Sequence, residues 1–436
     1  MLPPSGSRRR FGRVARVIKG AGPAATLGIF LASFTLLFVG CLSLTESPFW
    51  HSPAREEKPI EPVVMDRLIR VRLFGRKPHP SKKMSVTAPF TVIETSTGNP
   101  VAEAMQPING ATIRPAAGTG LELGDRRFAS DDILITPSRD AALVIDDKTY
   151  RGALRVQRSG AGLTFTNHVD IESYLRGVLR GELPRYFHIE SFKAQCVAAR
   201  TYALYTKRFK PAGSTFDVYD DEGSQVYSGV SVEDATSARA VDETRGEVCS
   251  YDNAGKQDIF CTYYSSCCGG LSQHVNNVKP RDPNVPPLAG GVVCRDCFVA
   301  PRYRWDPVTI SRAELTRKIV ARYPTLKRLG MIVDVKSHKM NDAGRHITID
   351  LVGSGGDQET LIAEDFRLSI GGRLLKSTNF KIEKTKDGFR FTDGKGFGHG
   401  MGLCQYGMET KARQGMGYRQ ILATYYPHST IQKIYD

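Results

Sequence analysis

Apolar and polar residues alternate along several stretches of the chain, and this alternation predicts strands. Residues 68–73 carry apolar side chains at every second position with arginines between them, which is the period of a half-buried strand. The alternation over 86–92 predicts another strand, and 163–165 and 347–351 mark two more. Residues 142–156 hold two apolar runs around an Asp-Asp-Lys turn, which predicts a hairpin.

Helical spacing of apolar residues predicts three helices among these strands. The first covers 171–181, where Asp170 can cap its start, and the second covers 190–208. A third lies near 232–244. The mixture of short strands and a few helices predicts an α+β fold, a strand-rich domain with several helices.

A carboxylate lies between the first two predicted helices. The connection Gly181-Glu182-Leu183-Pro184 is short, and its proline forces an extended or turn conformation just before it. A carboxylate fixed between two packed helices is well placed for chemistry. The alternative for Glu182 is a helix-capping bond or a surface ion pair.

Residues 1–45 are predicted to form a basic N-terminus followed by a membrane anchor or signal segment. Residues 21–44 carry no charged side chain, and about 20 such residues span a bilayer as a helix. Basic residues precede this run, so the remainder of the chain is expected outside the cytoplasm. Three outcomes stay open: a retained single-pass anchor, a lipid-modified Cys41, and cleavage on export.

Composition limits the class of the remaining chain. A hydrophobic content of 41% and a charged content of 24% exclude a disordered chain, a collagen and a polytopic membrane protein. Residues 46–66 contain four prolines and are expected to be an extended linker. We expect a strand-rich N-terminal part over 67–140 and the main domain over 141–436.

The chain is basic, with 60 lysines and arginines against 45 acidic residues. This surplus suits an anionic partner such as nucleic acid, a membrane surface or a cell-wall polymer. Nucleic acid is excluded because the chain lacks an aromatic-basic recognition motif and is expected to leave the cytoplasm.

Cysteines in two tight pairs indicate a metal site. Cys268, Cys294 and Cys297 are predicted to bind one zinc ion, with His274 or Cys267 as the fourth ligand. The two thiolates of a Cys-x-x-Cys turn bind a tetrahedral metal from one side, and two further ligands complete its coordination. The alternative is two disulfides, which an oxidising compartment permits.

Five glycines alternate with other residues over 394–402, with His399 among them. Alternate glycines let a backbone approach a ligand closely, although tight turns explain the same pattern. Phosphate binding is not expected, because no Lys-Ser or Lys-Thr pair follows.

Several co-linear segments resemble the SpoIID/LytB family. They are Tyr150–Gly152, Tyr174–Pro184, Phe192–Leu204, Ser224–Gly229, Thr244–Glu247, Leu375–Phe380, Gly398–Gly407 and Ile421–Pro427. Together they cover most of residues 66–436 in the expected order. The chain departs from the family's common pattern at Cys404, where serine is frequent, and at Cys267, where serine or threonine is frequent.

The resemblance implies an activity and a catalytic residue. The sporulation protein of this family resembles a lytic transglycosylase that degrades peptidoglycan strands lacking stem peptides, and the family's catalytic glutamate falls on Glu182. Gln225, Tyr227, His399 and Gln405 are candidates for lining a sugar groove, since amide and ring groups suit polyhydroxy ligands.

Two functions follow from the resemblance. The first is an enzyme that cleaves peptidoglycan glycan strands with Glu182 as its single acid and base. The second is a non-catalytic wall-binding enhancer of an N-acetylmuramoyl-L-alanine amidase, for which Glu182 would be dispensable. A cell-wall amidase is then the expected partner.

Overall fold

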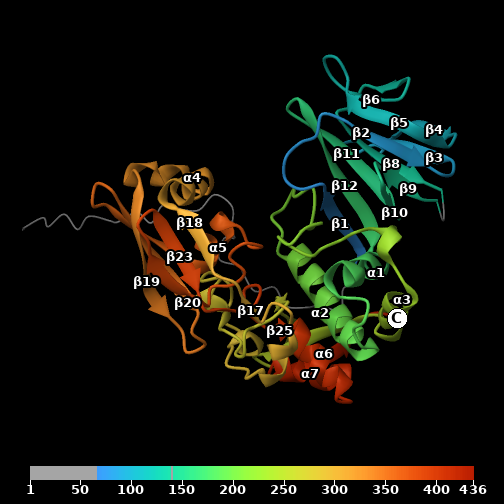
Figure 1. Cartoon of the computed structure of the whole chain (residues 1–436). Helices are drawn as coiled ribbons and strands as arrows, with labels where there is room; N and C mark the ends of the chain where they lie inside the picture. Colours follow the sequence, from blue (N-terminus) through green and yellow to red (C-terminus); the bar gives the residue numbers. More distant parts are fainter. Residues whose placement is uncertain (1–65, 139–140) are drawn as a thin grey trace, which may run out of the picture. The chain divides into compact units, whose positions relative to one another are not determined.

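The computed structural model describes residues 66–138 and 141–436 (Figure 1). The predicted anchor, Cys41 and the linker up to residue 65 lie outside the described residues. Within the described ranges, no helix is both long and apolar enough to cross a membrane. The fold of these ranges is mixed α+β, with several sheets and helices, as predicted.

Seven strands form one sheet in the order β13-β1-β12-β11-β8-β3-β4. Their bounds are β1 Leu68–Leu73, β3 Phe90–Glu94, β4 Pro100–Met105, β8 Asp132–Pro137, β11 Ala153–Ser159, β12 Gly162–Asp170 and β13 Val218–Tyr219. The predicted strand at 68–73 is therefore confirmed, and 163–165 lies within β12. Strands from both 67–140 and 141–436 share this sheet.

A second sheet has six strands in the order β10-β9-β2-β5-β6-β7. Their bounds are β2 Lys82–Val86, β5 Ile108–Pro115, β6 Leu121–Leu123, β7 Arg126–Phe128, β9 Leu143–Ile145 and β10 Lys148–Tyr150. Side chains of both sheets, such as Val71 and Ile113, are fully buried in one hydrophobic core.

Two strand predictions were wrong in detail. The pattern over 86–92 belongs to two strands, because β2 ends at Val86 and β3 begins at Phe90. Pro89 lies between them and has no N–H to donate to a ladder. The predicted hairpin closes between β9 and β10, whereas β11 leaves through Gly152 at a positive φ of 82° and joins β8 and β12.

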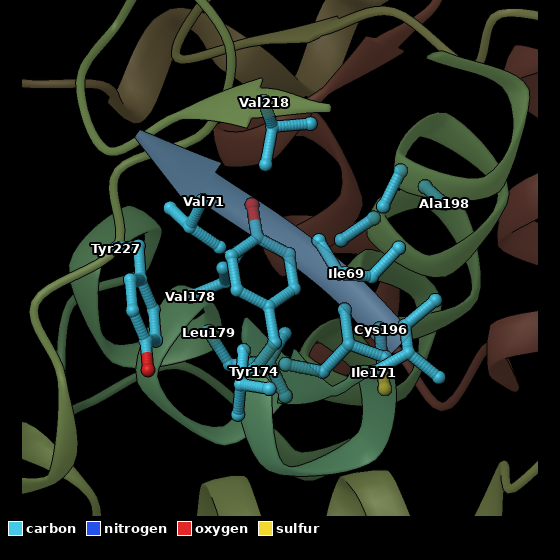
Figure 2. Packing of buried hydrophobic residues seen from close by; sticks show 14 of the residues in the cluster. Ile69, Val71, Ile171, Tyr174, Val178, Leu179, Cys196, Ala198, Val218 and Tyr227 are labelled. Carbon is cyan, nitrogen blue, oxygen red and sulfur yellow. The ribbon is translucent and has the colours of Figure 1, made fainter. Parts of the chain in front are cut away.

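Two helices cover one end of the first sheet. Helix α1 spans Ile171–Glu182 and α2 spans Ile189–Arg208, close to the predicted bounds. Asp170 caps α1 by accepting a bond from the N–H of Glu172, as expected. Figure 2 shows Tyr174 and Val178 of α1 packed with residues of β1 and α2. This packing fixes α1 and the position of its last residue.

The third helix is shorter than predicted. Helix α3 spans Ala235–Glu243, because Asp234 and Ser237 form a capping box at its start. The chain then forms a three-stranded sheet in the order β15-β14-β26. The remaining elements of this part are β14 Glu247–Asn253, β15 Lys256–Ile259, β16 Tyr264–Ser265, β25 Leu403–Cys404, α6 Gln405–Arg413, α7 Tyr418–Tyr425 and β26 Ser429–Lys433.

Residues between Trp305 and Phe391 form a second hydrophobic core. Two three-stranded sheets, β18-β23-β22 and β19-β20-β21, surround it with helices α4 and α5. The bounds are β17 Arg304–Trp305, β18 Val308–Ser311, α4 Arg312–Arg322, β19 Ile332–Met340, β20 His346–Gly353, β21 Gln358–Ile362, α5 Ala363–Ile370, β22 Lys381–Lys384, β23 Gly388–Thr392 and β24 Gly394–Lys395. The predicted strand at 347–351 lies within β20.

Candidate active site and cysteine cluster

Glu182 is the last residue of α1, and its side chain is half-buried. The helix ends there because Leu183 adopts an extended conformation, which the following Pro184 favours. The apolar face of α1 is buried, so its C-terminal end is held in place. The carboxyl group therefore has a defined position.

Three donors from distant parts of the chain contact this carboxyl group. The backbone N–H of Val226 donates to Oε1 over 2.8 Å, and the Tyr264 hydroxyl donates to the same oxygen over 3.4 Å. The Gln405 side-chain amide donates to Oε2 over 3.4 Å. Among the described residues, Oε1 therefore accepts two hydrogen bonds from the protein, whereas Oε2 accepts one.

A second layer of side chains holds Tyr264. The Gln225 amide donates to the Tyr264 hydroxyl over 3.0 Å and accepts a bond from the Tyr174 hydroxyl over 3.1 Å. Gln225 has no exposed surface. This predicted groove residue therefore lies beneath the site and orients Tyr264.

The other predicted groove residues differ in position. Gln405 contacts Glu182 directly. Tyr227 is buried and donates to the Asn167 side chain over 3.1 Å. His399 accepts from the N–H of Met401, and its ring packs edge-on against Tyr263. No hydrogen bond in the described ranges joins Tyr227 or His399 to Glu182.

Burial shifts the pKa values of Glu182, Tyr264 and His399. It raises the pKa of Glu182, and the bonds from Val226, Gln405 and Tyr264, which favour the carboxylate, offset only part of this effect. Burial also raises the pKa of Tyr264 well above its usual value, so its hydroxyl stays a donor. The pKa of His399 falls to about 4, again through burial, which leaves a neutral ring at neutral pH.

Sequence reasoning missed two contributors to the site. Tyr264 has no periodicity signal, and Val226 contributes only a backbone group, which carries no residue signature. Beside the site, Tyr186 is 59% exposed and its hydroxyl lies 3.1 Å from that of Tyr406. The two rings form an aromatic surface, and the exposed ring, Tyr186, lies four residues after Glu182 in the chain.

Four buried cysteines form a separate cluster. The Sγ atoms of Cys268, Cys294, Cys297 and Cys404 all lie within 4.8 Å of one another. Three of these four were predicted to be together. All eight cysteines of the described ranges are free, so the structure does not contain the alternative disulfides.

The fourth member of the cluster differs from both predicted ligands. His274 is held by other groups, because its Nε2 contacts Asn284 and its Nδ1 accepts from the N–H of Asn276. Cys267 directs its thiol to the carbonyl of Cys297. Cys404 occupies the fourth place. Its only sequence signal was the departure from the serine frequent in the family.

The geometry of the cluster suits a tetrahedral metal ion. The Sγ atoms of Cys268 and Cys297 are 3.7 Å apart. Two thiolates at about 2.3 Å from one tetrahedral zinc lie about 3.8 Å apart. The N–H of Cys268 donates to the Cys404 sulfur, and the Tyr425 hydroxyl lies 3.1 Å from the Cys294 sulfur. Such outer contacts orient the ligands of metal sites.

The alternating glycines enclose an arginine of the protein itself. Arg345 has no exposed surface and donates to the carbonyls of Cys268 and Gly398. Gly400 has a φ of 75°, and a Cβ there would lie 2.7 Å from the Arg345 guanidinium. The expected close approach to an external ligand is therefore a close approach to Arg345.

Comparisons with known proteins agree with this description. Residues 159–251 match the family model described as "Stage II sporulation protein", and residues 296–402 match a domain of unknown function, DUF8618. The first match contains Glu182 and Val226, and the second contains the whole second core. The chain therefore combines a SpoIID-type domain with a second domain that is inserted before its C-terminal segment.

Three relatives extend the similarity. The chain is 32% identical over 278 residues to an uncharacterized protein of Brachyspira hyodysenteriae, covering 64% of this chain and 70% of that one. It is 28% identical over 301 residues to the Amidase enhancer of Bacillus subtilis, covering 59% and 40%, and 27% identical over 282 residues to Stage II sporulation protein D of Bacillus subtilis, covering 61% and 75%. The chain belongs to the SpoIID/LytB family.

Proposed function

We propose that the chain acts on the bacterial cell wall and cleaves the glycan strands of peptidoglycan by a lytic transglycosylase reaction. The observation that carries this proposal is the Glu182 carboxyl group, whose pKa is raised by burial and which three donors hold in place. A raised pKa lets a carboxyl keep its proton to a higher pH, which suits a general acid. The match to the family's catalytic position supports the same role.

One carboxyl group suffices for this reaction. Protonated Glu182 donates its proton to the glycosidic oxygen, and the bond to the leaving sugar breaks. The resulting carboxylate then takes the proton of the substrate's own 6-hydroxyl as that oxygen closes on the anomeric carbon. No water is consumed, and the product ends in an anhydro sugar. Hydrolytic glycosidases instead use two carboxyl groups.

The donors around Glu182 assign separate tasks to its two oxygens. Val226 and Tyr264 both donate to Oε1, so this oxygen is already engaged as an acceptor. Within the described ranges, Oε2 receives one bond, from Gln405 over 3.4 Å. We therefore place the transferred proton on Oε2. The three donors then stabilise the carboxylate that forms after the first step.

We also propose that Cys268, Cys294, Cys297 and Cys404 hold one zinc ion. Four protein ligands leave no open position for water or substrate, so the role of this ion would be structural. Elemental analysis with a thiol count checks the assignment. One zinc per chain is expected, whereas an absence of both metal and free thiols would contradict it.

A non-catalytic enhancer of a cell-wall amidase is the second candidate, because one relative is named Amidase enhancer. Incubation of the full-length chain with glycan strands free of stem peptides distinguishes the two. Release of fragments with anhydro ends is expected for the enzyme. If the chain releases nothing but accelerates an added amidase, the enhancer function is correct.

We further propose that residues 46–436 lie outside the cytoplasm, anchored or exported through the charge-free run at 21–44. Protease added to spheroplasts is expected to degrade the chain before lysis. Protection until lysis would contradict this location.

A further inference from the structure

Helix α6 joins the cysteine cluster to the candidate active site. Cys404 directly precedes the helix, and Gln405 is its first residue. The Gln405 amide donates to Glu182 Oε2, while the Cys404 sulfur belongs to the cluster. One peptide bond therefore connects a cluster cysteine to a residue that contacts the proposed catalytic carboxyl.

The cluster also holds α6 along its length. Cys294 and Cys297 bracket Asp296, whose carbonyl accepts a bond from the Thr410 hydroxyl. The Asp296 carboxylate pairs with Lys411 at 2.9 Å. Thr410 and Lys411 lie in the second half of α6, so the Cys294–Cys297 turn fixes the helix at a second point.

Other residues of α6 hold the chain that follows Glu182. Glu409 accepts bonds from the backbone N–H of His188 over 2.7 Å and from the Ser191 hydroxyl over 2.8 Å. The Tyr406 hydroxyl contacts that of Tyr186. Movement of α6 would therefore displace both the donor to Glu182 and the loop that leaves it.

Charge gives an independent indication that the cluster is anionic. Arg345 is fully buried, and in the described ranges no carboxylate lies within ion-pair distance of its guanidinium. An unpaired buried charge is costly. Four thiolates around one divalent ion carry a net charge of −2, whereas four neutral thiols would leave Arg345 without a counter-charge. Arg345 donates to the carbonyl of the cluster residue Cys268, which places it beside that charge.

We propose that the metal-loaded cluster positions the active site. A thiophilic divalent cation on the four cysteines, balanced by Arg345, fixes α6 so that Gln405 and Tyr406 keep their places beside Glu182. The ion takes no part in bond breaking. This inference rests on the proposed function, because the site that it positions is the Glu182 site.

Cys404→Ser tests the inference in the full-length chain. It removes one thiolate, nearly keeps side-chain volume and restores the residue that is frequent in the family. Cys249→Ser is the matched control, since Cys249 is equally buried but lies outside the cluster. The measurements are zinc per chain, hydrogen-exchange protection of residues 405–413 and 183–188, and kcat and KM on stem-peptide-free strands.

Cys404→Ser is expected to lose zinc and the protection of both segments. Its kcat should fall about 10²-fold, the scale of a misplacement of about 1 Å, with KM changed less than about threefold. Cys249→Ser should keep zinc, protection and kcat. A Cys404→Ser chain that lacks zinc yet keeps protection and kcat would overturn the inference.

Refolding of the parent chain with and without zinc provides a second test, and comparing protection with activity separates the positioning role from the proposed activity. If Cys404→Ser does not fold, parent chain refolded with one equivalent of zinc is compared with parent refolded without it, and only the first should protect 405–413. If the parent releases no anhydro product but still loses this protection without zinc, the proposed activity fails while the positioning role stands. Unchanged protection without zinc refutes the positioning role whatever the activity.

Discussion

Replacement of Glu182 by glutamine is expected to abolish the release of anhydro-ended fragments. Glutamine keeps the shape of the side chain but cannot donate or accept the transferred proton. General acid–base catalysis contributes about 10² to 10⁴ in rate, and in the proposed reaction one group serves both steps, so the loss should reach at least the upper part of that range. Fragment release from stem-peptide-free strands measures it. Parental activity in Glu182→Gln would exclude Glu182 as the catalyst.

The same variant has an expected effect on stability that shows it is folded. The pKa of Glu182 is raised in the folded chain, so its protonated form stabilises the fold below the unfolded pKa of about 4.3, and this contribution is lost as the pH rises through the folded pKa. Glutamine does not titrate. Glu182→Gln should therefore melt at a higher temperature than the parent at pH 7.5, with a smaller difference at pH 4. A lower melting temperature at pH 7.5 would contradict this account of burial.

Removal of Glu172 is expected to cause the largest loss of stability. Its carboxylate receives two bonds from Arg200, over 2.9 and 2.6 Å, and the two side chains are 5% and 0% exposed. The Tyr435 hydroxyl donates to the same carboxylate. Glu172→Leu leaves the Arg200 charge buried without its partner, a change that costs about 3–5 kcal/mol. Denaturant unfolding measures the free energy.

Two controls separate the charge from the packing. The double variant Glu172→Leu with Arg200→Met removes both charges, and should recover much of the loss because a buried apolar pair can replace an ion pair. Lys381→Met breaks the exposed pair with Asp393, which should change the free energy of unfolding far less than Glu172→Leu does. A double variant less stable than Glu172→Leu alone would show that packing, not the unpaired charge, dominates.

Local features of the fold could be predicted from the sequence. Helices α1 and α2 followed from apolar spacing and from the cap at Asp170, and these signals lie within one element. The break at Pro89 was missed because apolar residues on both sides of it continued the alternation. The pairing of β11 with β8 and β12 depends on contacts between distant strands, which a local pattern does not contain.

In the candidate site, too, residues with a local sequence signal were predicted, whereas contacts between distant segments were missed. Glu182 stood out through its local setting and its family resemblance, whereas its partner Tyr264 comes from a distant segment without a pattern of its own. The cysteine cluster was predicted from the Cys-x-x-Cys spacing. Its fourth member was missed because Cys404 lies 107 positions after Cys297 and only the fold brings them together.

The contact between Gln405 and Glu182 spans 223 positions, which has a consequence for folding kinetics. The entropy lost on closing a loop grows with its length, by about 0.6 kcal/mol for each doubling. Within this span, β18 pairs with β23, so Val308 lies opposite Phe391, and β17 pairs with β24 just outside them. Folding of the second core therefore shortens the loop that remains to be closed. The Glu182 site is expected to assemble late, after these pairings have formed, and substitutions that weaken β18 or β23 should slow the docking of α6.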